Sequence, residues 1–253
     1  MSHSIKLFFI LPYLALRLLA DPILSSWFTE SSGQYARIYE TAADESALNP
    51  VTTWSHPNNG SGQALPTYAG VHEIAYTDTN VYIRTSGLGF HIMGPWYLNE
   101  ARTNIFPNYP GNTSAIFRFP RAPGTPPISK TATGNGTIGY FVDGIGMFDS
   151  RDAFSYSNSN AGDARPNSNF TGDGIWNRDA YVNESVTFDS ANAHQAGINH
   201  HYHANPPALR HLLGDSVDYD ASKNTYTESF NEQHSPIIGW VRDGYPIYGP
   251  YGY

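Results

Sequence analysis

Histidines gather in one short segment of this chain, residues 192–206. The segment contains four of the chain's 10 histidines: His194, His200, His201 and His203. If the segment is extended, His201 and His203 project from the same face, because side chains alternate along a strand. His200 and Tyr202 would then project from the opposite face. Two imidazoles on one face predict a transition-metal site, since imidazole nitrogen binds copper, zinc, iron and nickel.

Two further histidines are candidates for completing this site. His194 precedes a Gln-Ala-Gly turn that would fold it back over the strand as a third ligand, and the alternative is an imidazole that caps the turn. His234 precedes a Ser-Pro step, and sheet pairing would bring it to the same place. Three nitrogens with an open position would resemble a catalytic zinc-type site, whereas four in a closed shell would be structural.

Two other side chains, Asp243 and Tyr202, are candidates for contacting the ligand histidines without binding the metal themselves. Asp243 would orient a ligand imidazole through its carboxylate, and the alternative is that it only forms a turn with Gly244. Tyr202 is expected to pack beside the ligands. The sequence contains no Gly-rich phosphate loop, nucleophile elbow or His-Glu-x-x-His zinc motif. The residues therefore predict a site without predicting a reaction.

The composition favours a mainly β fold. Of the 253 residues, 40% are hydrophobic, and 18 Tyr, 13 Phe and 5 Trp favour strands over helices. The 23 Gly and 18 Pro add frequent turns and loops. We expect antiparallel, sandwich-like sheets with long loops and a few short helices, forming a single domain over residues 21–253.

Charge and cysteine content exclude several classes of protein. The net charge is −8 and no basic groove is evident, so nucleic-acid binding is not expected. The chain has no cysteine, which excludes disulfides and thiolate zinc sites. Any metal must therefore be bound by imidazole, carboxylate, amide, phenol or backbone oxygen.

The first 20 residues have the pattern of a secretory signal peptide. A basic start is followed by a short apolar run and a small residue before Asp21. The alternatives are an N-terminal amphipathic helix or a wrongly assigned start. No later segment is apolar enough to span a membrane. Asn-x-Ser/Thr sequons occur at Asn59, Asn112, Asn135, Asn169 and Asn183, and they are compatible with a secreted or cell-surface glycoprotein.

Alternation and turn residues predict several local elements. Residues 71–76 and 81–84 read as a hairpin around a turn at 77–80, and Trp27, Phe28 and Trp54 as core anchors. Further strands are expected at 87–93 and 114–119, a short helix at 206–214, and loops at 120–136, 155–176 and 215–233.

One segment is echoed later in the chain. Residues 138–148 and 238–248 both place Asp-Gly between two apolar runs. Asp-Gly favours the positive φ angles of a type I′ turn. We therefore expect two similar hairpins related by a pseudo-twofold axis, and the alternative is that such hairpins arose by convergence.

These features together resemble a known family. The residues that carry the resemblance are His-His-Tyr-His-Ala at 200–204, His-Ser-Pro-Ile-Ile-Gly at 234–239 and Asp-Gly-Tyr-Pro-Ile-Tyr-Gly-Pro-Tyr-Gly-Tyr at 243–253. They resemble the YHYH-domain family over roughly residues 90–253. One departure is His200, which stands where the name motif has its first tyrosine. The resemblance implies a secreted or cell-surface protein of uncertain biochemical role, and a family domain that continues beyond Tyr253.

The sequence thus predicts a secreted β protein that binds one transition-metal ion. Copper is preferred to zinc, because the ligand set lacks sulfur and the protein is expected outside the cytoplasm. The partner would be an extracellular polymer or a cell-surface component. The alternative is a non-catalytic module that binds glycan or protein through exposed aromatics, with its histidines only hydrogen-bonded in the core. A third reading is a structural component in which a metal clamps the fold.

Overall fold

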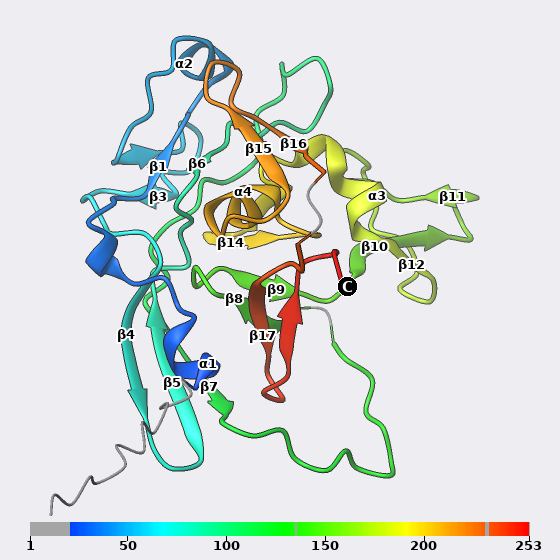
Figure 1. Ribbon diagram of the computed structural model, residues 1–253. Helices are drawn as coiled ribbons and strands as arrows, with labels where there is room; N and C mark the ends of the chain where they lie inside the picture. Colours follow the sequence, from blue (N-terminus) through cyan, green and yellow to red (C-terminus); the bar gives the residue numbers. More distant parts are fainter. Residues whose placement is uncertain (1–20, 135, 231–232, 253) are drawn as a thin grey trace, which may run out of the picture.

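The computed structural model describes residues 21–134, 136–230 and 233–252. The predicted signal peptide at 1–20 lies outside them. Short strands dominate, and the expectation of a mainly β fold with a few short helices is confirmed. The described strands form one six-stranded sheet and several sheets of two or three strands (Figure 1). The larger sheet carries the histidine-rich segment.

The elements follow one another at short intervals. The helices are α1 (Pro22–Ser25), η1 (Glu30–Ser32), α2 (Ala42–Ser46), α3 (Ala180–Glu184), η2 (Ser185–Thr187) and α4 (Pro207–Leu212). The strands of the first half are β1 (Arg37–Ile38), β2 (Trp54–Ser55), β3 (Gly62–Gln63), β4 (Val71–Tyr76), β5 (Asn80–Thr85), β6 (Ile92–Met93) and β7 (Ala115–Pro120). The later strands are β8 (Thr137–Phe141), β9 (Gly146–Phe148), β10 (Arg151–Ser157), β11 (Gly162–Asp163), β12 (Asn177–Asp179), β13 (Ala193–Ala196), β14 (Asn199–Tyr202), β15 (Val217–Asp220), β16 (Thr225–Glu228), β17 (Ile237–Val241) and β18 (Pro246–Tyr248).

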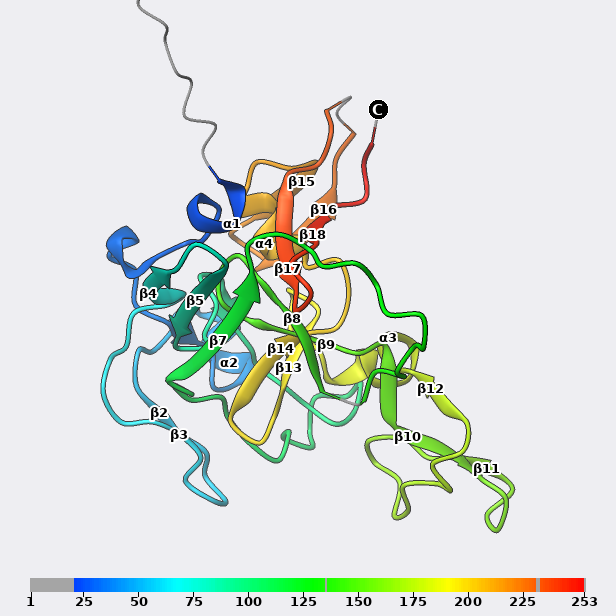
Figure 2. The same cartoon turned by 90° about the horizontal axis from the view of Figure 1, so that it is seen from below.

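The six-stranded sheet has the order β13-β14-β9-β8-β17-β18. Its strands pair antiparallel except β14 and β9, which run parallel with His201 opposite Gly146. Figure 1 shows β8, β9, β14 and β17 at the centre of the molecule. In Figure 2, β10, β11 and β12 project to one side beyond α3. The metal-binding candidates thus lie on an edge hairpin of the central sheet.

The two echoed segments form two hairpins, β8–β9 and β17–β18. Strands β8 and β17 pair antiparallel, and Tyr140 lies opposite its counterpart Trp240. The hydrogen bonds are symmetric as well, because Val142 N donates to Ile238 O and Arg242 N donates to Ile138 O, both at 2.9 Å. This register gives the local pseudo-twofold relation that the repeat predicts.

The turns of these hairpins differ from the predicted type I′ turn. Gly144 N donates to Phe141 O at 2.8 Å and Gly244 N donates to Val241 O at 2.9 Å. Positive φ occurs only at the glycines, +80° at Gly144 and +86° at Gly244, and not at the aspartates before them. This pattern is the three-residue hairpin loop in which a glycine in the left-handed region follows the turn. The expectation of type I′ turns is therefore wrong.

Several local predictions are corrected in the same way. The hairpin β4–β5, strand β7 and helix α4 lie where the sequence predicts them. The strand expected at 87–93 is reduced to β6, because Gly87 adopts positive φ and Gly89 packs closely on a side chain. The loops expected at 155–176 and 215–233 contain β11 and the hairpin β15–β16. The hairpin β15–β16 was not predicted because most of its strand residues are polar, although Tyr219 and Tyr226 stack across it with ring centroids 4.6 Å apart.

The edge hairpin β13–β14 packs between two hydrophobic clusters. The first contains Trp27, Tyr202 and Ala193, and the second contains Trp54 and Trp96. Trp27 and Trp54 are both buried, as predicted. The indole of Trp96 donates to Ala193 O at 3.0 Å, which ties the second cluster to the hairpin. Packing on both sides therefore fixes the strand that carries the histidines.

Two further expectations concern membrane spans and the glycosylation sequons. Within the described ranges, none of the helices has the length and apolar character that a membrane crossing requires. Asn59, Asn112 and Asn169 are exposed, whereas Asn183 is buried and its side-chain amide donates to Ala164 O at 3.3 Å. The sequon at Asn135 lies outside the described residues. Glycosylation at Asn183 would require this buried side chain to leave its site.

Candidate metal centre

A tight hairpin brings His194 and His201 face to face. Strands β13 and β14 pair antiparallel with His194 directly opposite His201. The two-residue turn between them begins with Gly197, whose φ is +61°. A glycine at the first central position suits the type II′ turn of two-residue hairpins. The turn thus folds His194 back over the strand, as the sequence predicts.

The Nε2 atoms of three histidines converge at this hairpin. His203 Nε2 lies 2.9 Å from His201 Nε2 and 2.9 Å from His194 Nε2. His203 follows the strand, and its backbone N donates to Asn192 O at 3.0 Å, which keeps the segment beside β13. All three ligand atoms lie within 4.8 Å of one another, so the group could hold a metal ion.

Hydrogen bonds at the far nitrogens leave the inner nitrogens free. His201 Nδ1 lies 3.1 Å from Asn199 O, and a carbonyl only accepts, so this Nδ1 carries the proton. Thr187 Oγ1 donates to Glu184 O at 2.7 Å and lies 2.6 Å from His194 Nδ1, which must then be the donor to Thr187. The Nε2 atoms of His194 and His201 therefore present lone pairs.

Two lone pairs then face a single neighbouring nitrogen. His203 Nε2 carries at most one proton when its ring is neutral, so it can satisfy only one of them. Whichever of His194 and His201 does not receive that proton has its Nε2 lone pair facing the Nε2 of His203 at 2.9 Å, and the two nitrogens repel each other. A cation between the three nitrogens removes this conflict. For tetrahedral bonds of about 2.0 Å the nitrogens would lie about 3.3 Å apart, which requires a small separation of the rings.

Burial keeps the three imidazoles uncharged at neutral pH. It lowers the pKa of His201 to about 4 and that of His203 to about 3, and it holds the pKa of His194 well below its usual value. Phe148 stacks on His201 with ring centroids 3.9 Å apart, and Phe188 stacks on His203 at 4.6 Å. A neutral imidazole held in a fixed orientation is the form that binds metals.

A carboxyl group lies beside the three nitrogens. Glu184, at the end of α3, places Oε2 3.4 Å from both His194 Nε2 and His203 Nε2. These distances match the spacing of ligand atoms around a tetrahedral ion, about 3.3 Å. Burial, together with the nearby Asp152, raises the pKa of Glu184. Glu184 and Thr187 were not among the residues predicted from the sequence, because neither lies in a repeated pattern or a recognisable motif.

The structure does not bring every predicted residue to this group. His234 is exposed, with Nδ1 2.7 Å from Ser235 O and its ring edge-on to Tyr248. Among the residues that the structure describes, it belongs to neither cluster of close metal-ligand atoms. Asp243 is exposed in its hairpin turn. The carboxylate beside the imidazoles is that of Glu184.

The opposite face of β14 carries a second buried polar group. Tyr202 lies there, and its hydroxyl donates to Asp143 Oδ2 at 2.8 Å, rather than contacting the three histidines. Asp143 is the counterpart of Asp243 in the first hairpin, and it is buried. Burial raises the pKa of Asp143 to about 6, and the Tyr202 hydrogen bond partly offsets that effect. His200 also lies on this face and is fully buried.

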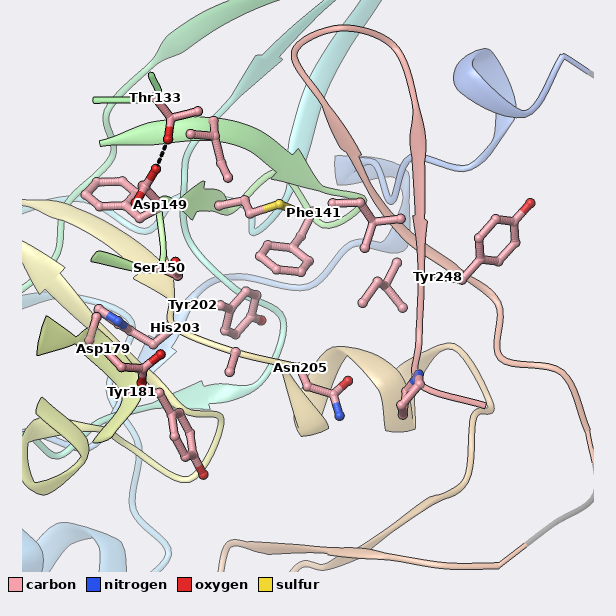
Figure 3. Close-up of a pocket in the computed structure, with 18 residues that line it drawn as sticks. Thr133, Phe141, Asp149, Ser150, Asp179, Tyr181, Tyr202, His203, Asn205 and Tyr248 are labelled. Carbon is pink, nitrogen blue, oxygen red and sulfur yellow. Dashed lines mark hydrogen bonds between the residues drawn. The ribbon is translucent and has the colours of Figure 1, made fainter. Parts of the chain in front are cut away.

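Two cavities meet the histidines. A small one of about 190 Å³ is lined by the three histidines and Glu184. A larger one of about 610 Å³ reaches His203 and continues past Tyr202. Figure 3 shows His203 and Tyr181 at one end of the larger cavity and Tyr248 at the other. His203 lines both cavities, so a molecule in the larger one would lie next to the three nitrogens.

The fold and the site define a β-rich protein with a buried three-histidine centre beside an open cavity. The chain belongs to the YHYH family: the family described as "YHYH protein" matches residues 116–253, which include the whole histidine hairpin. The match begins later than the predicted residue 90. No curated protein and no solved structure matches the chain.

Proposed function

We propose that this chain is a secreted or cell-surface protein that binds a transition-metal ion through His194, His201 and His203. The observation that carries the proposal is the convergence of three Nε2 atoms, two of them with their other nitrogen turned to an oxygen acceptor. Hydrogen bonds of this kind fix the tautomer of metal-binding histidines. The signal-like residues 1–20 support export.

The ligand set favours copper, with zinc second. It consists of imidazole nitrogens with a nearby carboxyl and no sulfur. Affinities of such sites rise toward Cu²⁺ and fall again at Zn²⁺. His234 is left out of the proposed ligand set because it is exposed and lies in neither described cluster.

The neighbouring cavity suggests what the metal does. If Glu184 does not bind the ion, the three histidine nitrogens would leave a fourth position open, where a bound Cu²⁺ or Zn²⁺ would polarise a substrate oxygen or activate water. The cavity of about 610 Å³ reaches His203 and is exposed at Tyr181 and Tyr248. A side chain of an extracellular polymer or a cell-surface component would fit such a cavity. We therefore propose that the centre acts on a molecule bound there.

One observation favours the alternative of a non-catalytic binding module. Trp176 and Tyr181 are 76% and 43% exposed in neighbouring segments, and Tyr248 at the other end of the cavity is 47% exposed. Exposed aromatic rings of this kind stack on sugars or on partner side chains. In that case ligand binding would persist in metal-free protein, and replacing Trp176 and Tyr181 by alanine would abolish it.

Calorimetric titration with Cu²⁺ and Zn²⁺ tests the proposal. The His201→Ala/His203→Ala variant should lose one equivalent of bound metal relative to the unaltered protein. His234→Ala is the matched control and should lose none. Equal binding by the double variant and the unaltered protein would rule out this centre. Loss of metal in His234→Ala would show that the ligand set differs from the one proposed.

A further inference from the structure

His200 is a buried imidazole whose two ring nitrogens lack a hydrogen bond of good geometry among the described residues. Its side chain is fully buried, and the groups that act on the ring include the His194 backbone and the Asp189 carboxylate. A buried polar group without a good partner destabilises the fold. The ring lies against the apolar ring of Trp96, with centroids 5.8 Å apart. A buried imidazole of this kind is a candidate for binding an ion or a water molecule.

Two other ligand-type side chains lie against His200. His91, Asp189 and His200 each offer a ligand atom, and these atoms lie within 4.8 Å of one another in a fully buried group. His91 Nε2 lies 3.3 Å from Asp189 Oδ2. Ligand atoms around a tetrahedral zinc ion with bonds of about 2.0 Å are also about 3.3 Å apart. The distance between His91 and Asp189 therefore fits an ion between them, and it is also that of the hydrogen bond they form.

Backbone amides hold the carboxylate of Asp189 in place, and among the described residues no lysine or arginine pairs with it. Asp189 Oδ2 accepts from Gly94 N at 3.0 Å, and Oδ1 accepts from Ala191 N at 2.9 Å. Its side chain is fully buried, and among the described residues its ion-pair partner is His91. A buried carboxylate needs a charge partner, and a divalent ion would supply it while also binding the free nitrogen of His200.

We propose that His91, Asp189 and His200 bind a zinc ion, at a second site independent of the three-histidine centre. Two imidazoles and a carboxylate form a ligand set that zinc accepts. The two sites lie on opposite faces of β14, because His200 and His201 are neighbours in a strand. His91 also lines a separate cavity of about 460 Å³, which provides a route of entry.

This second site would be a feature of this chain rather than of the motif. The family's name motif has tyrosine where this chain has His200. A tyrosine there would remove the imidazole of His200 and leave His91 as the one nitrogen ligand beside Asp189. His200→Tyr is therefore a substitution that restores the motif while deleting the proposed site.

Crystals grown with Zn²⁺, measured at the zinc absorption edge, test the second site. The unaltered protein should show two anomalous peaks and retain two equivalents of zinc after desalting. His200→Tyr should keep only the peak at the three-histidine centre, and His201→Ala/His203→Ala only the peak at His200. Asp189→Asn keeps the shape of the side chain and should lower the occupancy of the second peak alone.

The unaltered protein decides the question even if a variant fails to fold. A water molecule or no density at His200, with one equivalent of zinc retained, would overturn the second site. A peak at His200, with none between His194, His201 and His203 in crystals grown with Zn²⁺ or in crystals grown with Cu²⁺, would overturn the proposed function and leave the second site standing. The two failures are therefore distinguishable in these maps.

Discussion

Acid should destabilise the metal-free protein steeply, because four histidines are buried without charge. Burial lowers the pKa of His200 and His203 to about 3 and that of His201 to about 4, and the pKa of His194 is also well below normal. In the unfolded chain each histidine binds its proton near pH 6.5. The stability that these groups contribute is therefore complete above pH 6.5 and is lost as the pH falls toward 4.

The magnitude follows from the number of protons taken up on unfolding. Near pH 5 the four histidines bind about four protons in the unfolded chain and almost none in the folded protein. Asp143 and Glu184 act in the opposite sense, because burial raises their pKa values and the folded protein keeps about two protons there. The net uptake of about two protons corresponds to a slope of ~3 kcal/mol per pH unit. A fall from pH 6 to 4.5 would remove ~4 kcal/mol, a large part of the 5–15 typical of proteins.

Urea unfolding with a chelator present, followed by tryptophan fluorescence between pH 7.5 and 4.5, measures this slope. His200→Tyr removes one of the four groups and should lower the slope by about 1.4 kcal/mol per pH unit. His211→Ala changes an exposed histidine and serves as the matched control, with no change expected. Stability that is flat across this range, or that rises on acidification, would refute the claim that these imidazoles are buried and neutral.

Three further outcomes are expected. Thr187→Val removes the acceptor of the His194 Nδ1 proton and should weaken metal binding about 10–100-fold in calorimetric titration; unchanged affinity would contradict the tautomer assignment. Tyr202→Phe deletes a buried hydrogen bond and should cost about 1–3 kcal/mol in urea unfolding without altering that affinity; a parallel loss of metal would contradict the separation of the two faces. Gly144 has positive φ, and a methyl group there would overlap Thr85, so Gly144→Ala should cost about 2–5 kcal/mol in the same assay. Gly214→Ala, which also has positive φ but open space around it, should cost about 1–2 kcal/mol. Equal costs would contradict the close packing at Gly144.

The sequence predicted those parts of the fold whose signals are local. In the hairpin β4–β5, strand β5 has clear alternation, and the helix α4 has proline at its start and glycine just after its end. The repeat of 138–148 in 238–248 predicted paired hairpins, and the structure adds the antiparallel register. The hairpin β15–β16 was missed because its strands are mostly polar, and its pairing depends on contacts with α4 rather than on its own pattern.

The candidate site shows the same division. The histidine spacing and the turn at Gly197 predicted that His194, His201 and His203 lie together, although His203 lies just beyond the end of β14 rather than in the strand. Glu184 could not be predicted, because it reaches the site through the packing of α3 on the sheet. The repeat also offered two equivalent aspartates, and only the surroundings of the first hairpin bury Asp143 while Asp243 stays exposed. Sequence symmetry does not reveal such a difference in environment.

Electron paramagnetic resonance of the protein with one equivalent of Cu²⁺ tests the central claim most directly. The spectrum should show hyperfine splitting from imidazole nitrogens, and ¹⁵N labelling of histidine should change that splitting. To keep the second cluster from binding the ion, the comparison is made with His200→Tyr as the background. Adding His201→Ala/His203→Ala to it should abolish the splitting, while adding His234→Ala should not. A spectrum of aqueous Cu²⁺ from the His200→Tyr protein, or nitrogen splitting that survives when His201 and His203 are also replaced, would contradict a metal centre at these three histidines.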